Sequence, residues 1–126
     1  MIIKVPLRKS IKLEKEFQAD LWKWLRDMWC FVYKIPDASM WYKPYDMEFV
    51  FLDWETYHCE LKIIKWKSIN TNALRPNQHA SLSLITKLNP RIALVIVYST
   101  EVKDYTMMTY KDFMWSANEN WTISLF

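Results

Sequence analysis

The 126-residue sequence contains no glycine, although average usage of about 7% would give roughly nine. A phosphate-cradling P-loop, a dinucleotide-binding fingerprint and a GXXG nucleic-acid clamp each need backbone conformations that glycine supplies. The sequence therefore excludes these three kinds of site. Asparagine and aspartate tolerate positive φ best after glycine. We expect the residues with positive φ to be among Asp53, Asn70, Asn72, Asn77, Asn89, Asn118 and Asn120.

Long apolar runs are also missing. The longest, at 92–98, is far shorter than the ~20 residues that a transmembrane helix needs, and the N-terminal residues become charged too early for a secretory signal. The two cysteines, Cys30 and Cys59, lie in apolar runs and are expected to be free thiols in a reducing compartment, with a single disulfide as the alternative. We expect a cytoplasmic protein without a membrane segment.

The composition is that of a globular protein. Hydrophobic residues make up 52% of the chain and charged residues 25%, which separates it from disordered sequences. The length fits one domain over 1–126. A formal net charge of +3 permits a polyanionic partner without requiring one.

Hydrophobic periodicity predicts an α/β domain. Apolar residues such as Phe17, Leu21 and Leu25 recur at helical spacing, with Ser10 as a candidate N-cap. Alternating runs predict a hairpin, and the near-continuous apolar run at 92–98 is typical of a strand buried on both faces. The expected helices are 11–29, 76–88 and a short one within 111–118, and the expected strands are 30–36, 46–53, 57–66, 92–98, 105–110 and 121–126.

Two carboxylates and an ammonium group are predicted to meet where the hairpin opens. Alternate side chains of a strand share a face, so Glu60 and Lys62 point the same way. If Asp46 begins the partner strand, its carboxylate lies beside Glu60. Mg²⁺ is often held by one or two carboxylates with waters and substrate phosphate, and it activates water and polarises phosphodiesters. The pattern therefore favours a metal-dependent phosphodiesterase.

Tyr45-Asp46 after Pro44, followed after thirteen intervening residues by Glu60-Leu61-Lys62, resembles the signature of the PD-(D/E)XK nuclease superfamily. The order of predicted elements is similar to that family's restriction-endonuclease-like αβββαβ core, which has a mixed central sheet flanked by helices. Within the superfamily, the chain most resembles small Holliday-junction resolvases. An acid on the first helix, Glu16, and a glutamine at the start of the later helix, Gln78, carry this resemblance.

The resemblance implies a homodimeric DNA endonuclease that uses Mg²⁺ or Mn²⁺ and cuts branched DNA. Asp46, Glu60 and the carbonyl of Leu61 would hold the cation. Lys62 would serve the attacking water. Glu16 would be a further acid of the site, and Gln78 would support the site or touch DNA. Basic residues on either side of the motif would grip phosphates: Lys9, Lys12, Lys65, Lys67 and Arg75.

Simpler interpretations stay open. Glu60 and Lys62 are also compatible with a solvated edge strand, Glu16 with a helix surface, and the lysines with an ordinary solvated face. A nuclease of repair or restriction type, a non-catalytic DNA-binding module and a small structural protein are alternative functions. A zinc site is rejected, because His58 and Cys59 are adjacent on a strand and face opposite ways.

Overall fold

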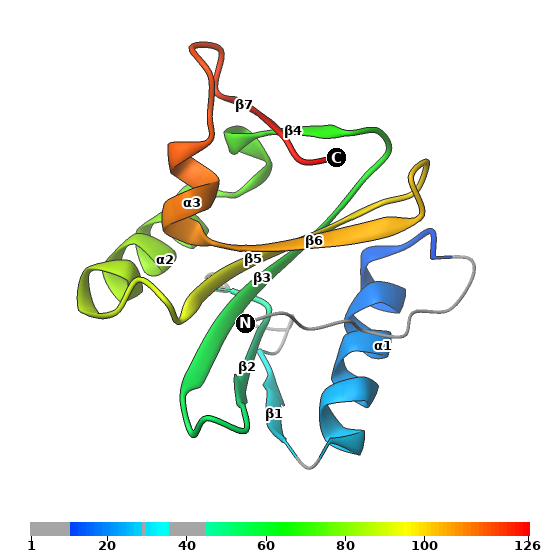
Figure 1. The fold of residues 1–126 in the computed structure, drawn as a ribbon, viewed down its shortest axis with the longest axis vertical. Helices are drawn as coiled ribbons and strands as arrows, with labels where there is room; N and C mark the ends of the chain where they lie inside the picture. Colours follow the sequence, from blue (N-terminus) through cyan, green and yellow to red (C-terminus); the bar gives the residue numbers. More distant parts are fainter. Residues whose placement is uncertain (1–10, 29, 36–44) are drawn as a thin grey trace.

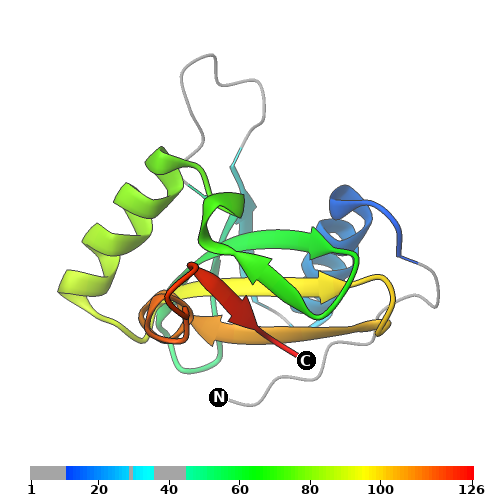
Figure 2. The ribbon, with the colours of Figure 1, turned by 90° about the horizontal axis from the view of Figure 1, so that it is seen from above.

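The computed structural model describes residues 11–28, 30–35 and 45–126. Its main element is a five-stranded mixed sheet in the order β1-β2-β3-β5-β6, and a two-stranded ribbon of β4 and β7 lies beside it (Figures 1 and 2). The chain order α1-β1-β2-β3-α2-β5 gives the predicted αβββαβ core and confirms the expected fold class. The strands are β1 (Phe31–Lys34), β2 (Met47–Val50), β3 (Thr56–Ile64), β4 (Ser68–Asn70), β5 (Ala93–Ser99), β6 (Asp104–Thr109) and β7 (Thr122–Ser124).

In the described part of the chain, three α-helices flank the sheets: α1 (Glu14–Asp27), α2 (Pro76–Leu88) and α3 (Tyr110–Trp115). A single 3-10 turn, η1 (Thr71–Ala73), precedes α2. Pro76 occupies the first turn of α2, as predicted, because its missing N–H would have no helical partner there. The first helix begins at Glu14, three residues later than predicted, with Leu13 in the N-cap position. Ser10, the predicted N-cap, lies outside the described residues. Among the described residues, no helix is both long and apolar enough to cross a bilayer.

β5 lies inside the sheet, between β3 and β6, and every residue in it is buried. It pairs in parallel with β3, whereas the other neighbouring strands are antiparallel. The prediction of a strand covered on both faces is therefore confirmed, since helices pack on both sides of it.

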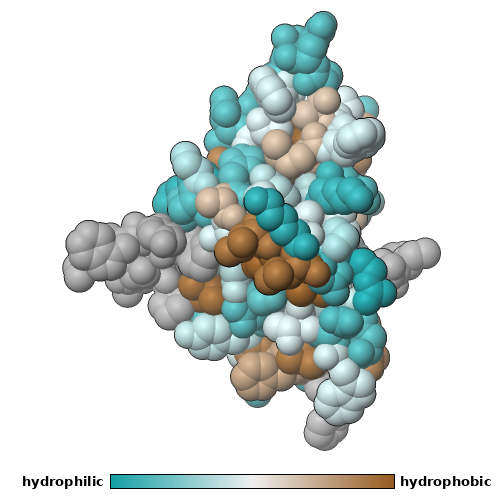
Figure 3. All heavy atoms as spheres, turned by 90° about the vertical axis from the view of Figure 1, so that its left-hand side faces the viewer, coloured by the Kyte–Doolittle hydropathy of each residue, from teal (hydrophilic) through white to brown (hydrophobic). Residues whose placement is uncertain are grey.

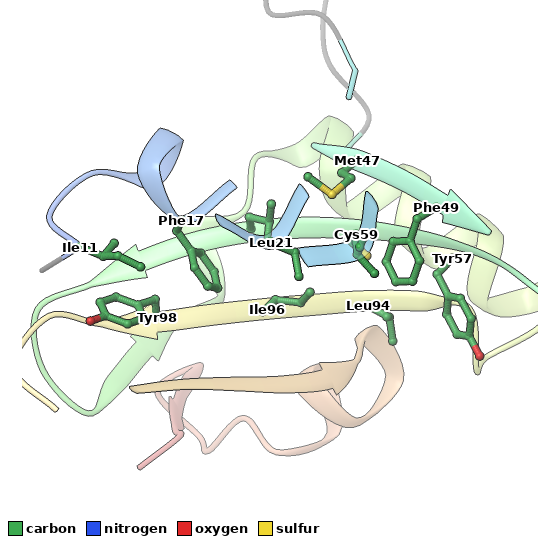
Figure 4. Packing of buried hydrophobic residues seen from close by; sticks show 12 residues of the cluster. Ile11, Phe17, Leu21, Met47, Phe49, Tyr57, Cys59, Leu94, Ile96 and Tyr98 are labelled. Carbon is green, nitrogen blue, oxygen red and sulfur yellow. The ribbon is translucent and has the colours of Figure 1, made fainter. Parts of the chain in front are cut away.

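Alternation along β3 and β5 divides the core between two layers. Cys59, Leu61 and Ile96 face α1 and pack with Phe17 and Leu21 (Figure 4). The opposite face of β5 packs against α2 and α3 through Val95, Val97, Leu82 and Phe113. Glu60 belongs to this second face of β3 by alternation, so a carboxylate enters a layer that is otherwise mostly apolar.

One outer side of the molecule is formed in part by α2. Figure 3 shows a patch of apolar atoms at the middle of that face, surrounded by polar ones. The helix exposes 62% of Leu84 and 82% of Leu88. These side chains contribute little to the core, so Leu84 is a suitable place for control substitutions.

The prediction for positive φ was wrong. In the described part of the chain, the residues with positive φ are Trp54, Lys103 and Trp121, at 64°, 59° and 59°. In the turns of Trp54 and Trp121, an aspartate or an asparagine acts one or more positions earlier through its side chain. Asp53 Oδ1 accepts the N–H of Glu55 at 3.0 Å, across Trp54. The polar residue closes the turn, and its neighbour takes the left-handed conformation.

Candidate active site

The site begins where β2 starts and leaves part of β3 without a strand partner on that side. The β2–β3 ladder ends at the pair Met47 and Cys59. The N–H of Asp46 donates to Cys59 O at 2.9 Å, and Asp46 Oδ2 accepts the N–H of Leu61 at 2.7 Å. The Asp46 side chain is thus fixed against β3 and is only 5% exposed.

Glu60 lies between these two contacts and is fully buried, with 0% exposure. Its Oε1 accepts a hydrogen bond from Gln78 Nε2 at 2.9 Å and lies 3.8 Å from Lys62 Nζ. Its Oε2 is also buried, and no described residue donates to it. A buried polar atom without a partner costs about 1–3 kcal/mol, and more when charged, so Oε2 is a place where a cation or a proton is needed.

A third carboxylate reaches the same point from the first turn of α1. Glu14, Asp46 and Glu60 each offer an oxygen, and these oxygens lie within 4.8 Å of one another. In the described ranges, this is the one group of histidine, cysteine and acidic side chains close enough to share an ion.

The electrostatics of the cluster favour a bound positive charge. Burial is the main cause that raises the pKa of Glu60 well above its ordinary value near 4.5, and hydrogen bonding and charge from Asp46 add to the rise. Lys62 lowers this pKa, whereas Glu14 raises it further. Two ionised carboxylates cannot donate to each other, so a shared proton or a cation has to hold the pair together.

These residues fit a hard divalent cation. Three carboxylates supply oxygen donors, as Mg²⁺ and Mn²⁺ prefer, and Glu60 Oε2 is an acceptor in need of a positive partner. The carbonyl of Leu61 points to the same edge of β3 as its N–H, since both backbone groups of a strand residue face one neighbour. The edge it faces is therefore the one that carries the Asp46 carboxylate.

Four of the residues predicted for the site are brought together. Asp46 and Glu60 share the carboxylate cluster, Lys62 Nζ lies next to it, and Gln78 holds Glu60. Gln78 is 6% exposed, and its Oε1 also accepts the N–H of Arg75 at 2.8 Å. The side chain therefore joins the start of α2 to the buried acid.

The acid that α1 contributes is Glu14, and the expectation that it would be Glu16 is corrected. Glu16 Oε1 accepts the N–H groups of Lys12 and Leu13, at 3.2 and 2.9 Å, and caps the helix. Glu14 precedes the buried Phe17 by three positions and Leu21 by seven. That spacing places Glu14 on the buried stripe of α1, and it was the signal in the sequence that could have identified this residue.

A polar network that the sequence did not reveal lies next to Asp46. The Tyr45 hydroxyl donates to Glu48 Oε1 and lies 2.9 Å from His58 Nδ1. His58 shares a face of β3 with Glu60, and burial is the main cause that lowers its pKa. Tyr45 is 8% exposed, so the residue before Asp46 is anchored by packing and by hydrogen bonds together.

The residues predicted to contact DNA lie on the surface where the structure describes them. Lys12, Lys65, Lys67 and Arg75 are exposed, and Lys65 Nζ lies over the ring of Trp66 at 5.1 Å. Lys9 falls outside the described residues. Contact between these basic residues and DNA stays a prediction.

Comparison of the chain with protein-family models, with curated proteins and with solved structures gives no match. The function therefore has to be inferred from the carboxylate cluster, its lysine and glutamine neighbours, and the spacing of the motif that carries them.

Proposed function

We propose that this protein is a metal-dependent DNA endonuclease that hydrolyses phosphodiester bonds. The observation that carries the proposal is the cluster of Glu14, Asp46 and Glu60, whose oxygens lie within 4.8 Å of one another. Glu60 is fully buried in this cluster, and its Oε2 has no donor among the described residues. An acid kept in such a position without a functional partner would be a poor choice for stability alone.

Each residue has a defined role in this proposal. Glu14, Asp46 and Glu60, with the Leu61 carbonyl, hold Mg²⁺ or Mn²⁺, which when bound polarises the phosphodiester and lowers the pKa of a water. Lys62 orients the attacking water or offsets the negative charge that develops on the phosphate oxygens. Gln78 keeps the Glu60 carboxylate oriented through the 2.9 Å hydrogen bond to Oε1. The oxygen of the attacking water forms the new P–O bond as the bond from phosphorus to the leaving oxygen breaks. The water releases a proton to solvent, and the leaving oxygen takes one up from solvent.

The structural neighbourhood supports a nucleic-acid substrate. Lys65 and Lys67 follow β3 immediately after the motif, and Arg75 begins the helix that carries Gln78; all three are exposed. Cations on both sides of a phosphodiester-cutting centre position the backbone without reading sequence. The resemblance of the motif to resolvases favours branched DNA, and a homodimer then supplies two centres for two symmetric strands. The free thiols of Cys30 and Cys59 suit a cytoplasmic location.

Cleavage of synthetic DNA tests the proposal. A labelled four-way junction, a flap and a linear duplex are each incubated with Mn²⁺ and one of three proteins: wild type, Glu60→Gln or Glu119→Gln. Glu119→Gln is the control, because Glu119 is an exposed glutamate. We expect wild type and Glu119→Gln to cut the junction in preference to the duplex, and Glu60→Gln to cut nothing. Preference for the flap or duplex would favour a repair or restriction nuclease. DNA binding with no cleavage by wild type would favour a non-catalytic module.

A further inference from the structure

A second hollow of the molecule is separate from the carboxylate cluster. It has a volume of about 540 Å³ and lies among η1, α2, α3 and the turn before β7, where its lining includes Asn72, Ala80, Ser83, Met114 and Trp121. Its size is within the range of ligand pockets, and its lining mixes apolar surface with a few polar groups, as such pockets do.

The walls of this hollow are held in place by His79. Its Nδ1 lies 2.7 Å from the Tyr110 hydroxyl, and its Nε2 lies 2.8 Å from the carbonyl of Thr71. One imidazole therefore ties α2 to both α3 and η1. The hollow is preformed, so a ligand would not have to order its walls.

Trp121 is presented at the hollow in a strained conformation. Its φ is 59°, a region that costs a bulky residue about 1–2 kcal/mol, and 60% of the residue is exposed. Asn118 fixes the turn, because its Oδ1 accepts the N–H groups of Asn120 and Thr122 at 2.8 and 3.0 Å. The Trp121 carbonyl also accepts the N–H of Thr71 at 2.9 Å. Strained backbone of this kind clusters at active sites and ligand-binding positions.

We propose that this hollow binds one unpaired nucleobase of a DNA strand, which stacks on the Trp121 indole. Stacking on an aromatic face accepts any base, and Met114 and Ala80 supply further apolar surface. Asn72 and Ser83 offer an amide and a hydroxyl to the edge of the base. The site thereby selects DNA that contains a single-stranded segment or an open branch point.

The first turn of α2 connects this hollow to the proposed catalytic centre. Gln78 contacts Glu60, and the next residue, His79, lines the hollow. Arg75 at the start of the same helix is exposed. A strand that crosses from one site to the other would therefore meet a guanidinium for its phosphate. As a substrate preference, the inference rests on the proposed nuclease function, whereas base binding itself is measurable without cleavage.

The experiment measures binding of a fluorescent oligothymidylate of about 12 nucleotides, in EDTA, so that cleavage plays no part. Wild type, Trp121→Asn and Trp115→Ala are compared; Trp115 is a control because it is a nearby tryptophan with 87% exposure. We expect Trp121→Asn to weaken binding about tenfold and Trp115→Ala to leave it nearly unchanged. Ala80→Phe, which fills the hollow and keeps the indole, should weaken binding as well.

A stability readout separates a binding role from a structural one. Asparagine tolerates positive φ better than tryptophan, so Trp121→Asn should unfold at the same or a higher temperature than wild type while it binds the oligomer more weakly. Equal binding by wild type and Trp121→Asn, equal losses in the two tryptophan variants, or no binding by wild type would overturn the proposal. If the protein fails to cleave DNA but binds the oligomer as expected, only the proposal for the carboxylate cluster is contradicted. If it cleaves DNA but oligomer binding does not behave as expected, only the proposal for the hollow is contradicted.

Discussion

Gln78 Nε2 donates to Glu60 Oε1 at 2.9 Å, and this hydrogen bond joins the first turn of α2 to the buried acid of the central hairpin. Glu60 Oε1 has a fixed donor, and Oε2 has none among the described residues. The two oxygens of the Glu60 carboxylate therefore have different surroundings, and Glu60 shares a cluster with Asp46 and Glu14.

Gln78→Ala should reduce cleavage roughly tenfold, because Glu60 loses the donor that orients it and a buried hydrogen bond is worth about 1 kcal/mol or more. Single-turnover rates at saturating Mn²⁺ measure the effect. Leu84→Ala, on the exposed side of the same helix, is the control and should cut at the wild-type rate. Equal rates for all three proteins would show that Gln78 does not support the site.

The two acids in the first turn of α1 should have opposite effects when replaced by alanine. Glu16→Ala removes the acceptor for two backbone N–H groups, so it should destabilise the protein by about 1 kcal/mol without loss of cleavage at low temperature. Glu14→Ala should weaken Mn²⁺ binding and cleavage with little change in unfolding temperature, since it also relieves repulsion from Asp46 and Glu60. Thermal unfolding and cleavage are measured on both variants. Loss of cleavage in Glu16→Ala, with loss of stability alone in Glu14→Ala, would show that Glu14 is not the acid of the site.

Lys62→Met should lower the cleavage rate by about 10²-fold, the usual effect of losing one positioned charge or donor, while Mn²⁺ binding is retained because lysine supplies no ligand. The side chain of Lys62 is 17% exposed, so methionine can replace its apolar stem. Lys65→Met, farther along the chain and exposed, is the matched control and should affect only DNA affinity. Loss of Mn²⁺ binding in Lys62→Met would indicate that the site had been disrupted rather than deprived of one charge.

Without metal, the stability of the wild-type protein should fall as pH rises from about 5 to 8. The pKa of Glu60 is raised in the folded state, chiefly by burial, so above the ordinary value near 4.5 the folded protein binds more protons than the unfolded chain. Stability then decreases with pH through that window. Glu60→Gln mimics the protonated acid, and its amide can donate towards Asp46.

Thermal unfolding of wild type and Glu60→Gln in EDTA, at pH values from about 5 to 8, measures this pH dependence of stability. Glu60→Gln should have the higher unfolding temperature at pH 8, and the difference in unfolding temperature between the two proteins should become smaller towards pH 5. A gap that does not change with pH would mean that Glu60 ionises normally in the folded protein.

The hairpin and its polar groups were predictable because they depend on local rules. Strand alternation placed Glu60 and Lys62 on one face of β3, and the short turn before Thr56 made β2 its antiparallel partner. Asp46 then had to lie near Glu60, since the ladder ends one residue after it. Pro76 likewise marked the start of α2, which delivers Gln78 to the cluster.

Other features depended on long-range contacts that the sequence does not display. β4 was not among the expected strands. It pairs with β7 through Ile69 and Ile123, and these two segments lie far apart in the chain. The choice of Glu14 over Glu16 depended on which side of α1 faces β3. The side chain of Asn118 closes the turn by accepting the N–H of Thr122, and Trp121, which lies within this turn, takes the left-handed conformation.

Mn²⁺ binding followed by electron paramagnetic resonance tests the carboxylate cluster most directly. Wild type, Asp46→Asn and Glu60→Gln are titrated with Mn²⁺ near pH 8, with Glu119→Gln as the control. The predicted result is a bound Mn²⁺ site in wild type and in Glu119→Gln that is lost or greatly weakened in both Asp46→Asn and Glu60→Gln. Equal Mn²⁺ binding by all four proteins, or no bound Mn²⁺ in wild type, would contradict the account.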